Sequence, residues 1–216
     1  GGDDYLIKPV DKLVLNSKLI AMQRIAHMRR ELKQATAQLE QVNQLLTQQA
    51  NEDGLTKLYN RRYIDHKLES MVAWHGRHNM PMALILLDVD FFKPFNDNYG
   101  HIEGDRCLQA IANQLKATFC RSGEYVGRYG GEEFVVLLGC TDTQTAEREA
   151  EQEAMYFLDY PHEYSSVSNR VTVSQGVFVF QPTGKEVQSD LYATVDKALY
   201  TSKSLGRNTH TLVNSL

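Results

Sequence analysis

The strongest constraint on the fold is a long segment, residues 12–49, that contains neither Gly nor Pro and is rich in Leu, Gln, Ala, Lys and Glu. This composition favours a helix, which would extend on the order of 60 Å at 1.5 Å per residue. Apolar side chains recur along the segment at the a and d spacing of a coiled coil. The a positions are Ile25, Leu32, Leu39 and Leu46, and the d positions are Met28, Ala35, Val42 and Gln49.

This narrow apolar stripe is flanked by Arg, Gln and Glu residues. Such a pattern favours a coiled coil over a helix that lies on the surface of its own domain. We therefore predict a homodimer that forms through this helix. A parallel pair is the expected arrangement, and the sequence leaves the orientation of the two helices open.

Helix-breaking residues divide the chain into three parts. Pro9 disfavours helix at the residue before it, and Asp11 can cap a helix that begins immediately afterwards. The run Asn51-Glu52-Asp53-Gly54 then ends the helix. The chain begins at Gly1 in a segment that reads like the middle of a protein, so we expect a fragment of a longer chain. The three parts are residues 1–11, residues 12–50 and residues 51–216.

The third part alternates between helix-like and strand-like stretches. Residues 82–88 form an almost continuous apolar run, typical of a central strand that is buried on both faces. Gly130-Gly131 is typical of a hairpin turn between two strands. The mixture of hairpin and helical connections predicts an α+β fold, a sheet covered by helices. The predicted helices are 63–75, 105–119, 143–158 and 189–204, and the predicted strands are 82–88, 124–129, 133–138, 171–180 and 209–213.

Composition excludes several classes of protein. The 216 residues are 42% hydrophobic and 23% charged, as in an ordinary globular protein. No apolar run approaches the roughly 20 residues of a membrane span, and there is no signal-peptide pattern. The formal charge of −4 argues against a nucleic-acid partner. The three cysteines lack zinc or CxxC spacing, which indicates reduced thiols and a cytoplasmic location.

Carboxylates gather at two places in the third part. Asp88 and Asp90 follow the apolar strand, and strand periodicity puts them on the same face. Glu132 and Glu133 follow the Gly-Gly pair. If the strand end and the hairpin are neighbours, Asp88 and one glutamate could share a hard cation such as Mg²⁺. The alternative is that these carboxylates are ordinary turn or surface residues.

Other polar residues are suited to a nucleotide. Residues 92–105 are interpreted as a polar, Gly-punctuated loop that leads into a helix. Its Asn96 and Asp105 offer an amide and a carboxylate that match the hydrogen-bonding edge of guanine, although Asp105 could instead cap the following helix. Lys203 and Arg207 lie four residues apart at a predicted helix end. They could bind phosphates or complement the helix dipole.

Together these motifs resemble the GGDEF family of diguanylate cyclases, from about residue 53 to residue 208. Gly1-Gly2-Asp3-Asp4-Tyr5 imitates the family signature but lacks the partner motifs. The segment around Lys8-Pro9 resembles the end of a response-regulator receiver domain, which implies input from two-component signalling. The matching motifs are Asp53-Gly54-Leu55-Thr56-Lys57-Leu58-Tyr59-Asn60-Arg61-Arg62, Asp88-Val89-Asp90-Phe91-Phe92-Lys93, Asn96-Asp97, Gly100-His101, Gly104-Asp105, Arg128-Tyr129-Gly130-Gly131-Glu132-Glu133-Phe134, Lys203 and Gly206-Arg207-Asn208.

The resemblance implies a fold similar to the palm of nucleotidyl cyclases and polymerases, and an enzyme that condenses two GTP into cyclic di-GMP and two pyrophosphates. Each chain of a homodimer would hold one GTP. By position in the motifs, the implied Mg²⁺ or Mn²⁺ ligands are Asp88, the Val89 carbonyl and Glu132. The implied guanine-binding residues are Asn96 and Asp105, and the implied triphosphate-binding residues are Lys93, Lys203 and Arg207. Glu133 is the implied base or orienting residue.

The family also has a product-inhibition site, Arg-x-x-Asp, placed five residues before the Gly-Gly pair. Here Arg121 and Glu124 hold those positions, and the acid is one methylene longer, so product binding could be retained or lost. The alternative function is a catalytically silent domain that binds GTP or cyclic di-GMP, but the signature turn and Asp88 are intact. A purely structural dimerisation module would explain the helix but not the polar residues. Adenine specificity is disfavoured by Asn96 and Asp105.

Overall fold

The computed structural model describes residues 12–139, 148, 151, 152, 154–156, 162, 163 and 170–215. The chain divides into two units, Gly1–Ala50 and Asn51–Leu216, which are described separately. The predicted receiver remnant and most of the predicted helix 143–158 lie outside the described residues. Within the described part, no helix is both long and apolar enough to cross a bilayer.

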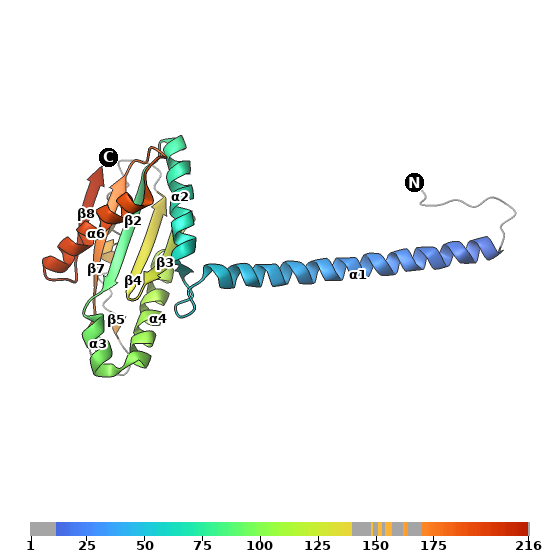
Figure 1. The fold of residues 1–216 in the computed structure, drawn as a ribbon, viewed down its shortest axis with the longest axis horizontal. Helices are drawn as coiled ribbons and strands as arrows, with labels where there is room; N and C mark the ends of the chain where they lie inside the picture. The colour runs from blue at the N-terminus through green and yellow to red at the C-terminus, as the bar shows by residue number, and fades with distance from the viewer. Residues whose placement is uncertain are drawn as a thin grey trace. The chain divides into compact units, whose positions relative to one another are not determined.

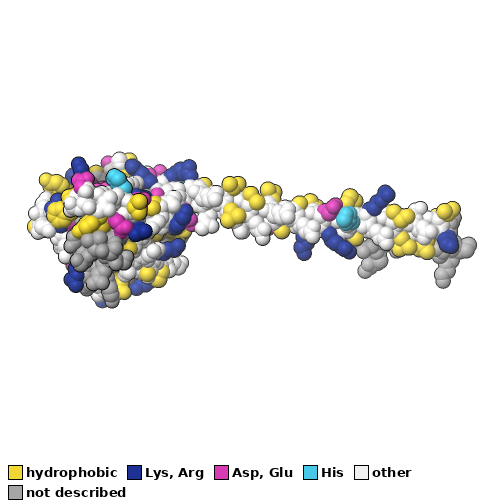
Figure 2. Space-filling view, turned by 90° about the horizontal axis from the view of Figure 1, so that it is seen from below, with side chains coloured by type: hydrophobic (Ala, Val, Ile, Leu, Met, Phe, Trp, Pro, Cys, Tyr) yellow, Lys and Arg dark blue, Asp and Glu magenta, His cyan; other side chains and the backbone are white. Residues whose placement is uncertain are grey.

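Helix α1 (Lys12–Asn51) confirms the predicted long helix and is 40 residues long. None of its residues is buried, and hydrophobic side chains are exposed along it (Figure 2). The a-position residues Leu32 and Leu39 are 69% and 70% exposed. Covering such a stripe would remove apolar surface from water, which is the usual driving force for helix pairing. The coiled coil itself stays a prediction.

The second unit is built on a six-stranded sheet in the order β1-β3-β4-β2-β7-β8 (Figure 1). The outer pairs β1/β3 and β7/β8 are parallel, and the three pairs between them are antiparallel. This mixed sheet confirms the predicted α+β fold. The strands are β1 (Tyr59–Asn60), β2 (Met82–Val89), β3 (Glu124–Gly130), β4 (Glu133–Gly139), β7 (Val173–Phe180) and β8 (His210–Ser215), and a separate two-stranded sheet holds β5 (His162–Glu163) and β6 (Arg170–Val171).

Helices cover both faces of the sheet, and β2 runs through its centre. The side chains of β2 alternate between two hydrophobic cores, with Ile85 and Leu87 in one and Leu84 and Leu86 in the other. Asp88 is the only residue of β2 that is not fully buried, and alternation along the strand places it on the same face as Leu84 and Leu86. Residues of α3 (Phe92–Tyr99) and α4 (His101–Thr118) join the first core, and residues of α2 (Arg61–His78) and α6 (Gln188–Ser204) join the second.

The prediction of a loop over residues 92–105 is wrong, because helix α3 occupies most of it. Pro94 is the third residue of α3, in the first turn, where no main-chain N–H is required for an intrahelical bond. Phe92 is buried in the core, and the rings of Phe95 and Tyr99 pack 4.8 Å apart. Burial of this aromatic face therefore outweighs the polar composition of the segment.

The alternative role of Asp105 as a helix cap is also wrong. Helix α4 begins at His101, and Gly100, with a φ of +84°, separates it from α3. Asp105 therefore lies in the second turn of α4, beyond the capping positions. The other described elements lie close to their predicted bounds, except that the two-residue strands β1 and β5 were not predicted and the predicted strand 171–180 is divided into β6 and β7. Cys107 and Cys120 are free thiols, and burial raises the pKa of Cys107 to about 12.

Candidate active site

Asp88 forms an ion pair at the end of the central strand. It stands opposite Glu133 of β4 and Ser174 of β7 in the sheet. The ammonium Nζ of Lys203, in the last turn of α6, lies 2.8 Å from Asp88 Oδ2. Burial raises the pKa of Asp88, and the Lys203 ammonium opposes this by favouring the carboxylate. The sheet end therefore holds a partly desolvated negative charge with one cation already beside it.

The signature hairpin between β3 and β4 lies beside this strand end. The main-chain N–H of Val89 donates to the Glu132 carbonyl over 3.3 Å. Gly131 has a φ of +53°, a left-handed conformation that glycine adopts without strain. The sequence predicted that Asp88 and a glutamate of the hairpin could share a cation if the strand end and the hairpin were neighbours. In the structure they are neighbours.

A pocket of about 230 Å³ opens at this point. It brings together six of the predicted site residues, which come from β2, α3, the hairpin and the end of α6. Asp90 is not among the residues that line it. The six are Asp88, Val89, Lys93, Glu132, Lys203 and Arg207, and Phe91, Phe92 and Pro94 complete the lining.

The donor atoms in this pocket suit a hard cation. Carboxylate oxygens of Asp88 and Glu132 and the main-chain carbonyl of Val89 are the ligand types that Mg²⁺ prefers. Among the described residues, no three His, Cys, Asp or Glu side chains are grouped so that they could hold a metal ion by themselves. The set therefore fits a cation that takes its remaining ligands from water or substrate oxygens, which is the usual coordination of Mg²⁺ beside phosphates.

Asp90 has surroundings different from those predicted for it. It lies one residue past β2 and is 6% exposed. Its carboxylate accepts hydrogen bonds from Thr172 Oγ1 at 2.8 Å, Ser174 Oγ at 2.6 Å and the main-chain N–H of Asn208 at 3.0 Å. Asp90 is therefore not a second acid of the pocket. The sequence predicted only that it shares a strand face with Asp88, and its donors at 172, 174 and 208 are too distant along the chain for a local pattern to pair them with it.

Arg207 lies in a turn with an unusual backbone. Gly206, Arg207 and Asn208 have φ values of +113°, +67° and +47°. A left-handed conformation costs roughly 1–2 kcal/mol at an ordinary residue such as arginine. The Arg207 guanidinium lies 4.6 Å from the centre of the Phe91 ring. Cation and ring therefore hold each other at the mouth of the pocket.

Asn96 and Asp105 lie on α3 and α4, outside the lining of the pocket. The two helices approach closely at Gly104, where a Cβ would overlap Asn96 Oδ1. Asn96 Oδ1 is buried, and no hydrogen-bond partner for it lies within the described part of the chain. A buried acceptor without a donor is uncommon in proteins. Asp105, which follows Gly104, is exposed.

Glu133 faces a different cavity. It lines a neighbouring pocket of about 490 Å³ together with Arg61, Tyr129, Tyr192 and Asp196, among others. Burial raises the pKa of Glu133, and the nearby Asp88 carboxylate raises it further. The structure thus separates Glu133 from the six residues of the first pocket, although it stands opposite Asp88 in the sheet.

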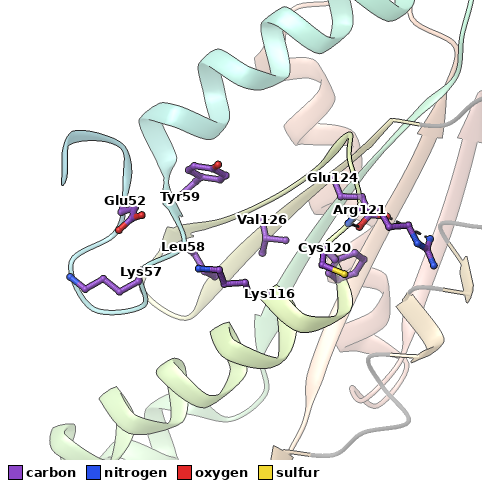
Figure 3. Close-up of a pocket in the computed structure, with 10 residues that line it drawn as sticks. Glu52, Lys57, Leu58, Tyr59, Lys116, Cys120, Arg121, Glu124 and Val126 are labelled. Carbon is purple, nitrogen blue, oxygen red and sulfur yellow. Dashed lines mark hydrogen bonds and ion pairs between the residues drawn. The ribbon is translucent and has the colours of Figure 1, made fainter. Parts of the chain in front are cut away.

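Arg121 and Glu124 line a third pocket, of about 320 Å³ (Figure 3). The Glu124 carboxylate accepts a 2.8 Å hydrogen bond from the Arg121 main-chain N–H, and the Arg121 guanidinium lies 3.6 Å from its other oxygen. Lys57 and Lys116 also line the pocket. The carboxylate of Glu124 is thus already bonded to Arg121, three residues earlier in the chain.

Arg128 ties the signature hairpin to the loop that begins the domain. Its Nε and Nη2 donate to the Gly131 carbonyl at 2.9 and 2.7 Å, and its Nη1 donates to Asp53 Oδ1 at 3.2 Å. Asp53 Oδ1 also accepts from the main-chain N–H and the hydroxyl of Thr56, at 2.8 and 2.7 Å. Both residues stand in the sequence motifs, but 75 positions separate them, so no local pattern could pair them.

Asp53 should stabilise the domain in a pH-dependent way. Burial alone would raise its pKa, but hydrogen bonds from Thr56 and Arg128 outweigh this and hold the pKa below the usual value of an aspartate. The stabilisation is therefore complete above the unfolded-state value and is lost as the pH falls through the folded-state pKa. We expect Asp53→Asn to lower the free energy of unfolding at pH 7 by about 1 kcal/mol, and the difference from the parent to shrink near pH 3.

Urea unfolding at pH 7 and at pH 3 measures this difference. Asp97→Asn, at an exposed carboxylate of α3, is the control and should change stability by less than about 0.5 kcal/mol. An Asp53→Asn deficit of equal size at both pH values would contradict the proposed role of the charge.

Comparison with known proteins identifies the family. Residues 50–209 match the family model described as the GGDEF domain of diguanylate cyclases. The chain belongs to the GGDEF diguanylate cyclase family. Its Gly130-Gly131-Glu132-Glu133-Phe134 hairpin corresponds to the GGDEF run for which the family is named, with Glu in the third position as a variant. The pocket described above lies beside this hairpin.

Relatives of the GGDEF domain include named cyclases. Diguanylate cyclase DgcP of Pseudomonas aeruginosa is 33% identical over 187 residues, which cover 87% of this chain and 27% of DgcP. The chain spans between about a quarter and a half of the length of the curated relatives that it matches first.

Two solved structures are also similar. The coiled coil and GGDEF domain of DgcB from Caulobacter crescentus, in complex with c-di-GMP, has a TM-score of 0.70 and 28% identity, covering 89% of this chain and 99% of that one. The active GGEEF domain of a diguanylate cyclase from Vibrio cholerae has a TM-score of 0.62 and 30% identity, covering 73% and 98%.

Proposed function

We propose that this chain is an active diguanylate cyclase, in which two copies, each holding one GTP, form cyclic di-GMP and two pyrophosphates. One observation carries the proposal: the signature residue Glu132, the strand-end Asp88 and the cations Lys93, Lys203 and Arg207 line one pocket. Two acids that suit a cation, beside three cations that suit a triphosphate, are the groups that nucleotidyl transfer requires.

The metal ligands proposed are Asp88, the Val89 carbonyl and Glu132, with Mg²⁺ as the ion and Mn²⁺ as a substitute. Lys203 contacts Asp88 Oδ2, so Oδ1 is the oxygen proposed for the metal. When bound, the ion would neutralise the triphosphate and polarise the α-phosphate. The main-chain bond between Val89 and Glu132 holds the two metal-binding segments together.

Lys93, Lys203 and Arg207 bind the triphosphate in this proposal. Arginine and lysine form charge-assisted hydrogen bonds with phosphate oxygens. Their positive charges also stabilise the negative charge that leaves with pyrophosphate. Lys203 is half-buried beside Asp88, so its position is set before substrate arrives.

The 3′-hydroxyl of one GTP attacks the α-phosphorus of the other. A new bond forms between O3′ and the α-phosphorus, and the bond from that phosphorus to the pyrophosphate oxygen breaks. Glu133 lines the neighbouring pocket but stands opposite Asp88 in the sheet, and from there it is proposed to orient the hydroxyl and accept its proton. The raised pKa of Glu133 moves this base closer to neutral pH, where proton transfer is more effective. A second attack in the opposite direction closes the ring.

Asn96 and Asp105 are proposed to recognise guanine, whose N1–H and N2–H groups are donors. The unpartnered Asn96 Oδ1 supports a ligand donor at this place. We expect Asp105→Asn to raise the KM for GTP about 10- to 100-fold, because a charge-assisted hydrogen bond contributes roughly 1.5–3 kcal/mol. Steady-state kinetics measures the effect. Glu103→Gln removes another α4 carboxylate, which is paired with Arg106, and should leave KM within about twofold.

The product-binding role of Arg121 and Glu124 is proposed in a weakened form. The bonds between Glu124 and Arg121 would have to break before the carboxylate could bind guanine. Feedback inhibition by cyclic di-GMP is therefore expected to be weaker than with a free aspartate.

The proposed organisation is a receiver remnant (1–11), a coiled coil (12–50) and a cyclase domain (51–216). The homodimer forms through the exposed seam of α1. The coiled coil in the DgcB structure supports this assignment. Phosphorylation of an upstream receiver domain would then act on the geometry of the dimer.

Incubation of the purified chain with GTP and Mg²⁺, followed by chromatography, tests the proposed function. We expect cyclic di-GMP from the parent and none from Glu132→Ala. GTP binding without any product would favour the alternative of a silent regulatory module. The active GGEEF domain from Vibrio cholerae, whose name gives the same signature, supports activity.

A further inference from the structure

We propose that Asp90 is a positioning residue that holds the turn after α6 so that Arg207 points into the pocket. The inference rests on the proposed role of Arg207 in binding the GTP triphosphate. It assigns a function to the buried carboxylate that the metal site and the guanine site do not use.

The first support is the set of partners around Asp90. Two hydroxyls, of Thr172 and Ser174, and the main-chain N–H of Asn208 all donate to its two oxygens, over 2.6–3.0 Å. A buried carboxylate is retained in a fold when several donors surround it in this way. Asn208 is the residue after Arg207, so the bond fixes the backbone on one side of the arginine.

The second support is the conformation of the turn. Three successive residues, 206–208, have a left-handed backbone, and two of them are not glycine. Such a conformation persists only where surrounding contacts over-determine it. On the other side of the turn the Arg207 N–H donates to the Ser202 carbonyl at 3.1 Å. The turn is therefore held at both sides of Arg207, by α6 and by Asp90.

The third support is the place of Asp90 in the chain. It lies two residues after Asp88 and next to Phe91, whose ring packs against the Arg207 guanidinium. Its own N–H donates to the Thr172 carbonyl at 2.9 Å. One short segment thus carries the proposed metal ligand and anchors the proposed triphosphate cation, so Asp90 sets the spacing between them.

Binding of a non-hydrolysable GTP analogue with an α,β-methylene group, in the presence of Mg²⁺, tests the inference. The comparison ligand is guanosine, which lacks phosphates, measured by competition. Arg207→Ala should weaken binding of the analogue about 10-fold and leave guanosine unchanged. Asp90→Ala should do the same, and the double variant should be no weaker than either single one, because both changes remove the same contact.

Conservative variants distinguish a loss of affinity caused by misplacement of Arg207 from one caused by unfolding of the domain. Asp90→Asn keeps an acceptor for Asn208 and should restore most of the affinity. Thr172→Val removes one donor to Asp90 and should weaken the analogue about threefold. Thr118→Val is its matched control, since it removes a 3.0 Å hydroxyl bond to the Gln114 carbonyl in α4 and touches neither Asp90 nor the turn; it should bind like the parent.

The outcomes are distinguishable. An Asp90→Ala variant that binds the analogue within twofold of the parent, or a double variant about 100-fold weaker than the parent, overturns the inference. If Asp90→Ala does not fold, equal affinities for Thr172→Val and Thr118→Val overturn it. If Arg207→Ala binds like the parent, the role on which the inference rests is wrong and the inference falls with it. A parent that does not bind the analogue refutes the proposed function itself.

Discussion

Glu132→Gln is expected to lower the rate of cyclic di-GMP formation on the order of 100- to 1,000-fold, whereas Glu132→Asp is expected to stay within about tenfold of the parent. Glutamine has the same shape but removes one of the two charged ligands proposed for the metal, and electrostatic stabilisation of that kind is worth about this much in catalysis. Aspartate keeps the charge and restores the GGDEF run for which the family is named. Initial rates at saturating GTP and Mg²⁺ measure both effects.

The pair of variants also shows how the prediction can fail. Glutamine activity within tenfold of the parent would mean that Glu132 does not hold the metal. An aspartate variant as inactive as glutamine would mean that the length of the side chain matters as much as its charge. Unchanged thermal unfolding in both variants is the control for folding, which is expected because Glu132 is half-buried in a turn and belongs to neither hydrophobic core.

Breaking the seam of α1 should have a comparable effect on activity. Leu32→Lys combined with Leu39→Lys places charges at two a positions, where both leucines are about 70% exposed in the single chain. We expect these variants to be monomeric and, at micromolar enzyme, to lose activity at least about 100-fold. The reason is that dimerisation raises the effective concentration of one half-site near the other into the millimolar range.

Size-exclusion chromatography with light scattering, together with initial rates over a range of enzyme concentrations, measures this effect. The matched control is Ala37→Lys combined with Gln44→Lys, which adds the same charges to α1 outside the a and d positions. The control should remain dimeric and active. A Leu32/Leu39 double variant that is monomeric and fully active would refute the proposal that two chains must meet to form the product. A double variant that is still dimeric would refute the proposal that the a positions of α1 form the dimer interface.

The parts of the fold that sequence predicted best are those with strong local patterns. The apolar run of β2, the Gly-Gly turn and the Gly-free helix α1 each form where expected, because burial, turn geometry and helix propensity are local properties. Helix α3 was missed because its polar composition hides an aromatic face, and that face packs on residues distant in the sequence. Strands β1 and β5 were missed because a segment of two residues is too short to show the alternation of apolar and polar side chains that marks a strand.

The candidate site shows the same limit. The pocket gathers Asp88, Glu132 and Lys203, as the motif resemblance implied. The contacts of Asp90 and Arg128 could not be read from the motifs, since their partners lie 84 and 75 positions away. Spacing along a strand suggested that Asp90 would stand with Asp88, but the strand ends at Val89. Past Val89 the alternation of the strand no longer applies, and the position of the Asp90 carboxylate is set by its hydrogen bonds to Thr172, Ser174 and Asn208.

The proposed cyclase activity is tested most directly by a time course of both products formed from GTP and Mg²⁺ by the purified chain. We expect two pyrophosphates to be released for each cyclic di-GMP. The rate should rise more steeply than linearly with enzyme concentration at concentrations where only part of the enzyme is dimeric. Dimers that bind GTP and release no cyclic di-GMP, even when a fused parallel leucine zipper aligns the two copies, would contradict the proposed activity.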